Sequence, residues 1–217
     1  MIKKNSLLLT TLVAASLLAG LSACVPLVVG GAAVGAFMVT DRRTSGAQIE
    51  DEGIELRGAS RVREALGERA HVNVTSYNRQ VLLTGEVPNE QAKQQAEQAI
   101  SRVENVKAVV NELAIMPNSS LQDRSGDVLT TGKVKASLVD AKDLQAAAFK
   151  VVTERGTVYL MGRVTQREAD RATQMTRTIS GVRRVVRIFE LLTEEELQRL
   201  GTAQPQPARA PSSPAAN

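Results

Sequence analysis

The chain has 217 residues, of which 43% are hydrophobic and only 2% aromatic, and it carries 27 Lys and Arg residues against 23 Asp and Glu residues. This length holds one ordinary domain or two small ones. Its single His is His71 and its single Cys is Cys24, so an intrachain disulfide is excluded. A zinc site would consist almost wholly of carboxylates, and a catalytic triad or dyad would need His71. The composition therefore argues against an enzyme.

The first 23 residues are typical of an export signal. Lys3 and Lys4 precede an apolar run over residues 7–18, and small residues follow it. The run is shorter than the ~20 residues that a membrane-spanning helix needs. We therefore expect residues 1–23 to be a cleaved signal peptide rather than a membrane anchor.

The sequence Leu-Ser-Ala-Cys at positions 21–24 resembles the lipobox of bacterial lipoproteins. The resemblance implies cleavage before Cys24, which then carries S-diacylglycerol and an N-linked palmitoyl chain; the alternative is a Cys placed there by chance. Three acyl chains, at ~0.8 kcal/mol per buried CH2, hold a protein on a membrane far more firmly than one. In lipoprotein sorting, Val25 in place of Asp after the Cys points to the outer membrane. We expect a lipid-anchored protein that mainly faces the periplasm.

Two segments outside the folded part are distinguished by composition. Residues 24–46 form an apolar, Gly-rich segment that is too short to span a membrane, and we interpret it as a flexible lipidated spacer. An ordered or membrane-embedded role for its apolar part is the alternative. Residues 202–217, rich in Pro and Ala, cannot build a core and are expected to be disordered.

An internal repeat with a period of about 76 residues organises the middle of the chain. The segment at 81–87, VLLTGEV, aligns with VYLMGRV at 158–164, and VENVKAVV at 103–110 aligns with ISGVRRVV at 179–186, with one residue fewer between the blocks. An upstream pair, Val62 and Leu66, is aligned with Val134 and Leu138. The predicted domains are residues 47–117 and 124–193, joined by a linker at 118–123.

Each repeat is predicted to fold as helix, strand, strand, helix, strand. In the first repeat, Ala92, Ala96, Ala99 and Val103 recur at helical spacing. In the second, Thr165 and Glu168 form a capping-box pattern that begins the equivalent helix. We expect an α+β fold, with a three-stranded mixed sheet and two helices on one face of it in each repeat. The closing strands are predicted at 106–115 and 182–192, and a short helix at 194–201.

The pattern Val-x-Leu-x-Gly-x-Val, a helix bearing Ala, and Gly-Val-x-x-Val-Val resembles the BON domain. Residues 158–162 and 180–186 carry it best, whereas the first repeat has Asn105 where the family usually has Gly. With the lipobox and spacer, the chain is similar to the dual BON-domain outer-membrane lipoproteins of Gram-negative bacteria. The resemblance implies a non-enzymatic protein that supports envelope integrity. It also implies binding of anionic phospholipid, such as phosphatidylglycerol or cardiolipin, by the second BON domain.

The charges divide unequally between the repeats. Residues 49–117 hold 8 Lys and Arg against 11 Asp and Glu, a net charge of −3, and residues 124–193 hold 13 against 7, a net charge of +6. A basic surface beside a bilayer is attracted to anionic head groups. Export makes nucleic acid an unsuitable partner for it. Ordinary solvated surface charge is the alternative explanation.

Helical spacing selects one face of the opening helix of the second repeat. Val134 and Leu138, with Thr131, are assigned to the core side, so Leu129 and Lys133 fall on the opposite face. An exposed Leu one turn from a Lys suits shallow insertion into a bilayer, with the ammonium left among phosphates. The alternative is that Leu129 packs on the linker or on the other repeat. The candidate phospholipid-binding residues are Leu129, Lys133, Lys135 and Ala136. In the alignment of the two repeats, Arg57, Arg61 and Glu64 of the first repeat correspond to Leu129, Lys133 and Ala136.

Other polar residues are predicted to have structural roles. A lone His cannot complete a zinc site, so we expect His71 to be structural, with no metal and no cofactor besides the lipid on Cys24. Strand alternation places Arg183 and Arg187 on one side of the closing strand and Arg184 on the other.

Two other functions remain open at this stage. One is a protein-binding adaptor, whose acidic first repeat or sheet edge recruits an envelope assembly protein. The other is a hydrolase that uses carboxylates, although no paired-carboxylate motif can be placed in the sequence.

Overall fold

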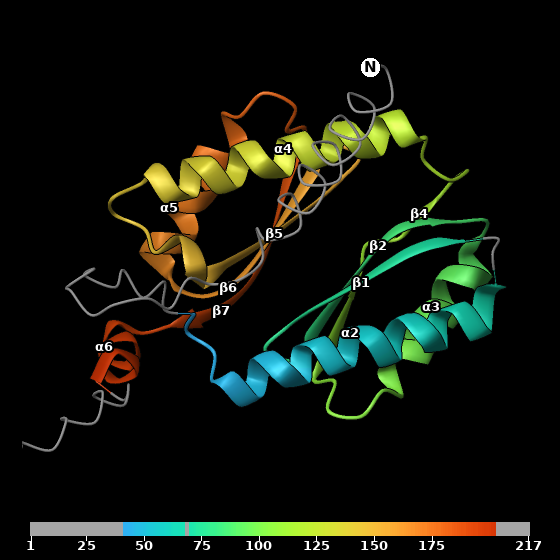
Figure 1. Cartoon of the computed structure of the whole chain (residues 1–217), viewed down its shortest axis with the longest axis horizontal. Helices are drawn as coiled ribbons and strands as arrows, with labels where there is room; N and C mark the ends of the chain where they lie inside the picture. Colours follow the sequence, from blue (N-terminus) through green and yellow to red (C-terminus); the bar gives the residue numbers. More distant parts are fainter. Residues whose placement is uncertain (1–40, 68–69, 203–217) are drawn as a thin grey trace, which may run out of the picture. The chain divides into compact units, whose positions relative to one another are not determined.

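The computed structural model describes residues 41–67 and 70–202, in which the predicted succession of elements occurs twice (Figure 1). The predicted signal peptide, Cys24, the spacer up to residue 40 and the tail from residue 203 lie outside the described residues. By its internal contacts, Val39–Asn217 forms one compact unit that includes both repeats.

The first repeat is a mixed sheet with two helices on one face (Figure 1). Its central strand pairs antiparallel with the first strand and parallel with the closing one. The predicted fold class is confirmed. The elements are α2 (Ser45–Leu66), β1 (His71–Tyr77), β2 (Gln80–Val87), α3 (Glu90–Ser101), β3 (Ala108–Asn111) and β4 (Ala114–Ile115).

The second repeat has the same topology, with a central strand paired antiparallel to one neighbour and parallel to the other. Its second helix begins at the predicted capping box of Thr165 and Glu168, and the short C-terminal helix is also present. The elements are α4 (Leu121–Asp140), η3 (Ala146–Ala148), β5 (Phe149–Glu154), β6 (Thr157–Thr165), α5 (Gln166–Arg177), β7 (Arg184–Leu192) and α6 (Glu194–Thr202).

The closing strand of the first repeat differs from its prediction. In place of one strand over 106–115, the short strands β3 and β4 both pair with β2. Between them, the Leu113 N–H donates to Asn111 Oδ1 at 3.3 Å, which draws this N–H away from the strand ladder. Gln80 pairs with Ala108, whereas Thr157 pairs with Arg184, so the second repeat does use one residue fewer between these strands.

A buried aspartate ties the opening helix of each repeat to the turn of its hairpin. In the second repeat, Asp127 accepts the backbone N–H groups of Arg155 and Gly156 at 2.6 and 2.8 Å. Both turn residues have positive φ, 49° and 69°, as a type I′ hairpin turn requires. In the first repeat, Asp51 accepts the equivalent N–H groups, both at 2.7 Å. Two backbone donors in each turn are thereby satisfied by a single side chain.

The equivalence of Asp51 and Asp127 corrects the alignment of the two opening helices. It matches Val62 with Leu138 rather than with Val134, one helical turn from the predicted match. The positions equivalent to Leu129, Lys133 and Ala136 are therefore Gly53, Arg57 and Ser60, and not Arg57, Arg61 and Glu64. A shift of four residues leaves the buried face of a helix almost unchanged, so apolar periodicity could not detect it.

Three apolar clusters build the compact unit. One lies between the helices and sheet of the first repeat, and one between those of the second. The third lies between the faces of the two sheets that carry no helices, and includes Tyr77 and Leu82 from the first repeat and Tyr159, Met161 and Ile188 from the second. The Tyr77 hydroxyl donates to the Ala148 carbonyl oxygen across this interface, at 3.3 Å. The repeats are therefore held together by a continuous apolar contact.

Two predicted boundaries move. Residues 41–46, assigned to the spacer, include the start of α2, and Arg42 is buried, with both ends of its guanidinium 2.7 Å from the Glu168 carboxylate. Burying a charge requires such a paired arrangement, so this segment is fixed to the second repeat. The linker predicted to end at residue 123 gives way to α4 at Leu121, because Ser120 and Asp123 form a capping box.

We expect Asp127→Ala to lower the free energy of unfolding of residues 39–217 by about 3 kcal/mol, because two backbone N–H groups lose a charged acceptor. Urea denaturation followed by circular dichroism measures this change. Asp140→Ala, at an exposed carboxylate on the same helix, is the control and should change stability by less than about 0.5 kcal/mol. Equal effects of the two substitutions would contradict the role assigned to Asp127.

Candidate functional site

The face of α4 that points away from the core is the first candidate site. Val134 and Leu138 are buried, as predicted, and Leu129 is 67% exposed. Lys133, Lys135 and Ala136 are exposed too, so the phase predicted for this helix is confirmed. Leu129 thus packs neither on the linker nor on the other repeat within the described part of the chain.

The apolar surface on α4 is larger than the sequence analysis indicated. Leu121, Val128 and Val139 are 80%, 71% and 70% exposed. They are spaced seven and eleven residues apart, so they share one side of the helix, adjacent to Leu129 and Ala136. Extending the helical wheel over the whole helix would have found them. We call these five residues the α4 apolar stripe: Leu121, Val128, Leu129, Ala136 and Val139.

Cations without carboxylate partners border this stripe. Within residues 41–67 and 70–202, no ion pair involves Lys133 or Lys135, nor Lys142 just beyond the helix. Many of the other basic residues of the second repeat form ion pairs with carboxylates. These pairs are Lys150 with Glu55, Arg155 with Glu86, Arg163 with Glu190, Arg171 with Asp143, Arg184 with Glu112, and Arg187 with Asp170. The lysines of α4 are thus available to an external anion.

The equivalent helix of the first repeat has a different surface. Arg57, the counterpart of Lys133, forms an ion pair with Glu50 at 2.7 Å. Ile49 and Leu56 are exposed on α2, but Glu52 is exposed between them. Among the described helices, none is both long enough and apolar enough to cross a membrane.

As strand alternation predicted, the arginines of the closing strand do not form a single cluster. Arg184 pairs with Glu112 of the first repeat, and Arg187 pairs with Asp170 of α5 on the other side of the sheet. These two cations serve contacts within the protein.

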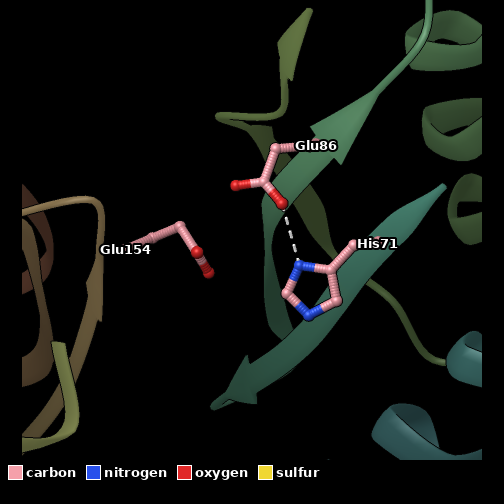
Figure 2. A group of neighbouring side chains, drawn as sticks. All are labelled: His71, Glu86 and Glu154. Atoms are coloured by element: carbon pink, nitrogen blue, oxygen red, sulfur yellow. Dashed lines mark hydrogen bonds and ion pairs between the residues drawn. The ribbon is translucent and has the colours of Figure 1, made fainter. Parts of the chain in front are cut away.

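A second candidate site lies where the two repeats meet. His71, Glu86 and Glu154 each offer a ligand atom, and these atoms lie within 4.8 Å of one another. Figure 2 shows the Glu154 carboxylate pointing towards Glu86 and His71, which come from the neighbouring strands β1 and β2. His71 Nδ1 lies 3.0 Å from Glu86 Oε2. We call these three residues the inter-repeat cluster.

Strand register places the two members from the first repeat. His71 begins β1 and pairs directly with Glu86 of β2. The adjacent Gly85 has a φ of 113°, and a Cβ there would collide with the His71 carbonyl oxygen. The close approach of the two strands therefore requires glycine at this position. Glu154 ends β5, directly before the turn that Asp127 fixes.

Glu86 is a buried carboxylate with several partners. Arg155 Nη1 lies 2.6 Å from Glu86 Oε1, and the Ser119 N–H donates to Oε2 at 3.2 Å. Burial alone would raise the pKa of Glu86, but the hydrogen bonds from Ser119, His71 and Arg155 outweigh it and lower the pKa. Glu86 is therefore ionised at neutral pH.

Glu154 is buried with far less compensation. It is 4% exposed, and its only hydrogen bond within the described residues comes from Asn73 Nδ2 to Oε2, at 3.0 Å. Burial raises the pKa of Glu154, and the negative charge of Glu86 raises it further. His71, Asn73 and Glu154 line a pocket of about 290 Å³, which also borders α4 at Arg124 and Val128.

Sequence reasoning could not find this cluster. His71 looks isolated in sequence, because the chain has no second His and its single Cys, Cys24, is not nearby. The two carboxylates follow it by 15 and 83 positions, and Glu154 belongs to the other repeat. Only the packing of the two repeats brings them together, and no local pattern encodes that packing.

The family comparison matches both repeats. The model of the BON domain matches residues 57–117 and 126–192. These ranges include the hairpins, second helices and closing strands described above, the C-terminal part of α2 and most of α4.

Similar proteins are known from several bacteria. Outer membrane lipoprotein DolP of Haemophilus influenzae is 40% identical over 79% of this chain and 90% of its own length. The 21 kDa hemolysin of Actinobacillus pleuropneumoniae is 32% identical over 69% of this chain and 78% of its own. Among solved structures, CdsD, a structural protein of the Type III secretion system of Chlamydia trachomatis, is 16% identical, covers 73% of this chain and 99% of its own, and has a TM-score of 0.29.

We expect Glu154→Gln to stabilise residues 39–217 at pH 7.5 in the presence of a chelator, and to have little effect near pH 4. The raised pKa means that the folded state keeps a proton which the unfolded chain releases above pH 4.5. The contribution of Glu154 is therefore fully present below pH 4.5 and is lost as the pH rises through the folded-state pKa. Gln is neutral throughout and avoids this loss.

Urea denaturation at the two pH values tests this expectation. Glu104→Gln, at an exposed glutamate, is the matched control and should show no such dependence on pH. A difference between Glu154→Gln and the parent protein that is the same at both pH values would refute the raised pKa.

Proposed function

The chain belongs to the BON domain family and is an outer-membrane lipoprotein, and we propose that its second BON domain docks on anionic phospholipid and thereby supports envelope integrity. Phosphatidylglycerol and cardiolipin are the candidate lipids. The observation that carries this proposal is the α4 apolar stripe, which is exposed beside lysines without carboxylate partners.

The lipid anchor and the docking helix have separate tasks in this proposal. S-diacylglycerol and N-palmitoyl groups on Cys24 would keep the protein on the membrane. The 16 residues between Cys24 and Asp41 span at most about 55 Å when fully extended, so the folded unit stays close to the bilayer. Tethering of this kind raises the effective concentration of a weak second contact. The docking helix can therefore select lipids without holding the protein by itself.

The chemistry of α4 suits shallow docking on a bilayer surface. The apolar tips of Leu129 and its neighbours would enter the boundary between head groups and acyl chains. Lys133 and Lys135 are long enough to leave their ammonium groups among phosphates, and each contributes about 1 kcal/mol near an anionic surface. The buried side of α4 remains in the core of the second repeat, so docking requires no unfolding.

A protein-binding adaptor is the second candidate function. Ile49 and Leu56 favour it, because they are exposed seven residues apart on one side of α2. The net negative charge of the first repeat would keep this surface away from anionic lipid, and thus free for a protein of the envelope.

We expect Leu129→Glu to weaken binding of residues 39–217 to vesicles containing phosphatidylglycerol or cardiolipin by tenfold or more. The substitution removes an inserting side chain and adds a charge that anionic head groups repel. Flotation with anionic vesicles, and with vesicles of phosphatidylcholine alone, measures the change. Circular dichroism should show an unchanged fold, since Leu129 is exposed.

Leu56→Glu is the matched control for this experiment. Leu56 is 76% exposed on the equivalent helix of the acidic repeat, so its substitution should leave lipid binding unchanged. Equal losses in both variants, or none in Leu129→Glu, would overturn the assignment of α4. Failure of the parent fragment to bind anionic vesicles would favour the adaptor function instead.

We expect Lys133→Ala and Lys135→Ala each to weaken vesicle binding about fivefold at low ionic strength, which corresponds to about 1 kcal/mol. The difference should shrink towards zero near 1 M salt, where the Debye length is about 3 Å. Flotation over a salt series measures it. Lys107→Ala removes an exposed lysine of the first repeat as a control, and a loss as large as those on α4 would indicate a general charge effect.

A further inference from the structure

We propose that His71, Glu86 and Glu154 bind a divalent first-row transition cation, with Zn²⁺ as the probe, between the two BON repeats. Each residue presents a donor atom that such cations accept, one imidazole nitrogen and two carboxylate oxygens. This site is distinct from the α4 apolar stripe, and its existence does not depend on lipid binding.

The spacing of the three donors is close to that of a tetrahedral site. Ligands on a common Zn²⁺ lie about 3.4 Å apart, given metal–ligand distances of about 2.0–2.1 Å. His71 Nδ1 and Glu86 Oε2 are 3.0 Å apart, and all three donor atoms lie within 4.8 Å. A closure of at most about 1.4 Å by the Glu154 side chain completes the arrangement, and side-chain rotation can supply it.

Charge supplies the second argument. Buried carboxylates need a cation, a metal or a proton. The Arg155 guanidinium neutralises Glu86 through Oε1, which leaves Oε2 facing His71. Glu154 has no ion pair within the described residues, and its Oε1 receives no hydrogen bond there. A divalent cation would compensate this second buried charge and could bind Glu154 Oε1 directly, while Glu86 Oε2 would contact the metal in place of His71.

The surroundings of the donors have the form of an outer coordination shell. Asn73 Nδ2 donates to Glu154 Oε2, and Ser119 donates to Glu86 Oε2 through its N–H at 3.2 Å. Such hydrogen bonds hold ligating carboxylates in position. The pocket lined by His71 and Glu154 provides a route for the hydrated ion and space for a water ligand.

Coordination fixes the tautomer of His71. In the absence of the metal, His71 Nδ1 lies within hydrogen-bonding distance of Glu86 Oε2, at 3.0 Å. For Nδ1 to coordinate through its lone pair, the imidazole proton has to reside on Nε2. Glu154 coordinates as the carboxylate, and a proton bound to it competes with the metal. Metal affinity should consequently rise with pH.

The only His in the chain makes the site directly observable. Residues 39–217, uniformly labelled with ¹⁵N and freed of metal by a chelator that is then removed, are titrated with ZnCl2 at pH 7.5. We expect saturation at one equivalent in calorimetry. We also expect a large shift of the ¹⁵N resonance of Nδ1 of His71, complete at the same equivalent.

Variants distinguish this site from adventitious surface binding. Glu154→Gln should weaken Zn²⁺ binding at least tenfold while keeping the fold, because the amide has the shape of the carboxyl group and retains an acceptor for Asn73. Asp143→Asn, at an exposed carboxylate, should bind Zn²⁺ as the parent does. An unshifted His71 resonance at one equivalent, or equal Zn²⁺ affinity in Glu154→Gln and the parent, would overturn the proposal. Vesicle flotation in chelator tests lipid docking separately.

Discussion

The hydrogen bonds from the hairpin turn to a buried aspartate are the constraint on which both candidate sites depend. Asp127 joins α4 to the turn between β5 and β6, and so fixes the rotation of the helix against the sheet. With this rotation set, Leu129 faces solvent. The same bonds anchor the backbone at Arg155 and Gly156, so the side chains of Glu154 and Arg155 are held towards the first repeat. A single buried carboxylate therefore positions one site on the surface and another at the interface.

Much of the fold was predictable because it is encoded locally and twice. Capping residues such as Thr165, the strand motifs around Gly85 and Gly162, and the period of the apolar residues each specify an element without reference to its partners. The face of α4 that carries Leu129 followed from the same periodicity. Where the prediction erred, periodicity carried no information: a slip of one helical turn between the opening helices preserves their buried face, and the break after Asn111 depends on a side-chain hydrogen bond.

The remaining features arise from contacts between the repeats, which no local pattern specifies. Tyr77, Leu82 and Tyr159 are ordinary strand residues in sequence, yet they form the apolar contact between the two sheets. Arg42 is indistinguishable in sequence from a charged spacer residue, and its burial against Glu168 is visible only in the folded chain. The inter-repeat cluster belongs to this class as well. Its members become neighbours only because the sheets pack face to face.

The duplication provides an internal comparison that separates what the fold requires from what each site requires. Both repeats retain the buried aspartate and the glycine on the central strand, because the hairpin and the close strand approach need them. Alignment of Gly85 with Gly162 places Ala148 and Arg163 at the positions of His71 and Glu86. The second repeat therefore lacks the donors of the inter-repeat cluster, just as the first lacks the unpaired lysines of α4. Residues that differ between two copies of one backbone are free of its structural demands, and the members of both candidate sites are among them.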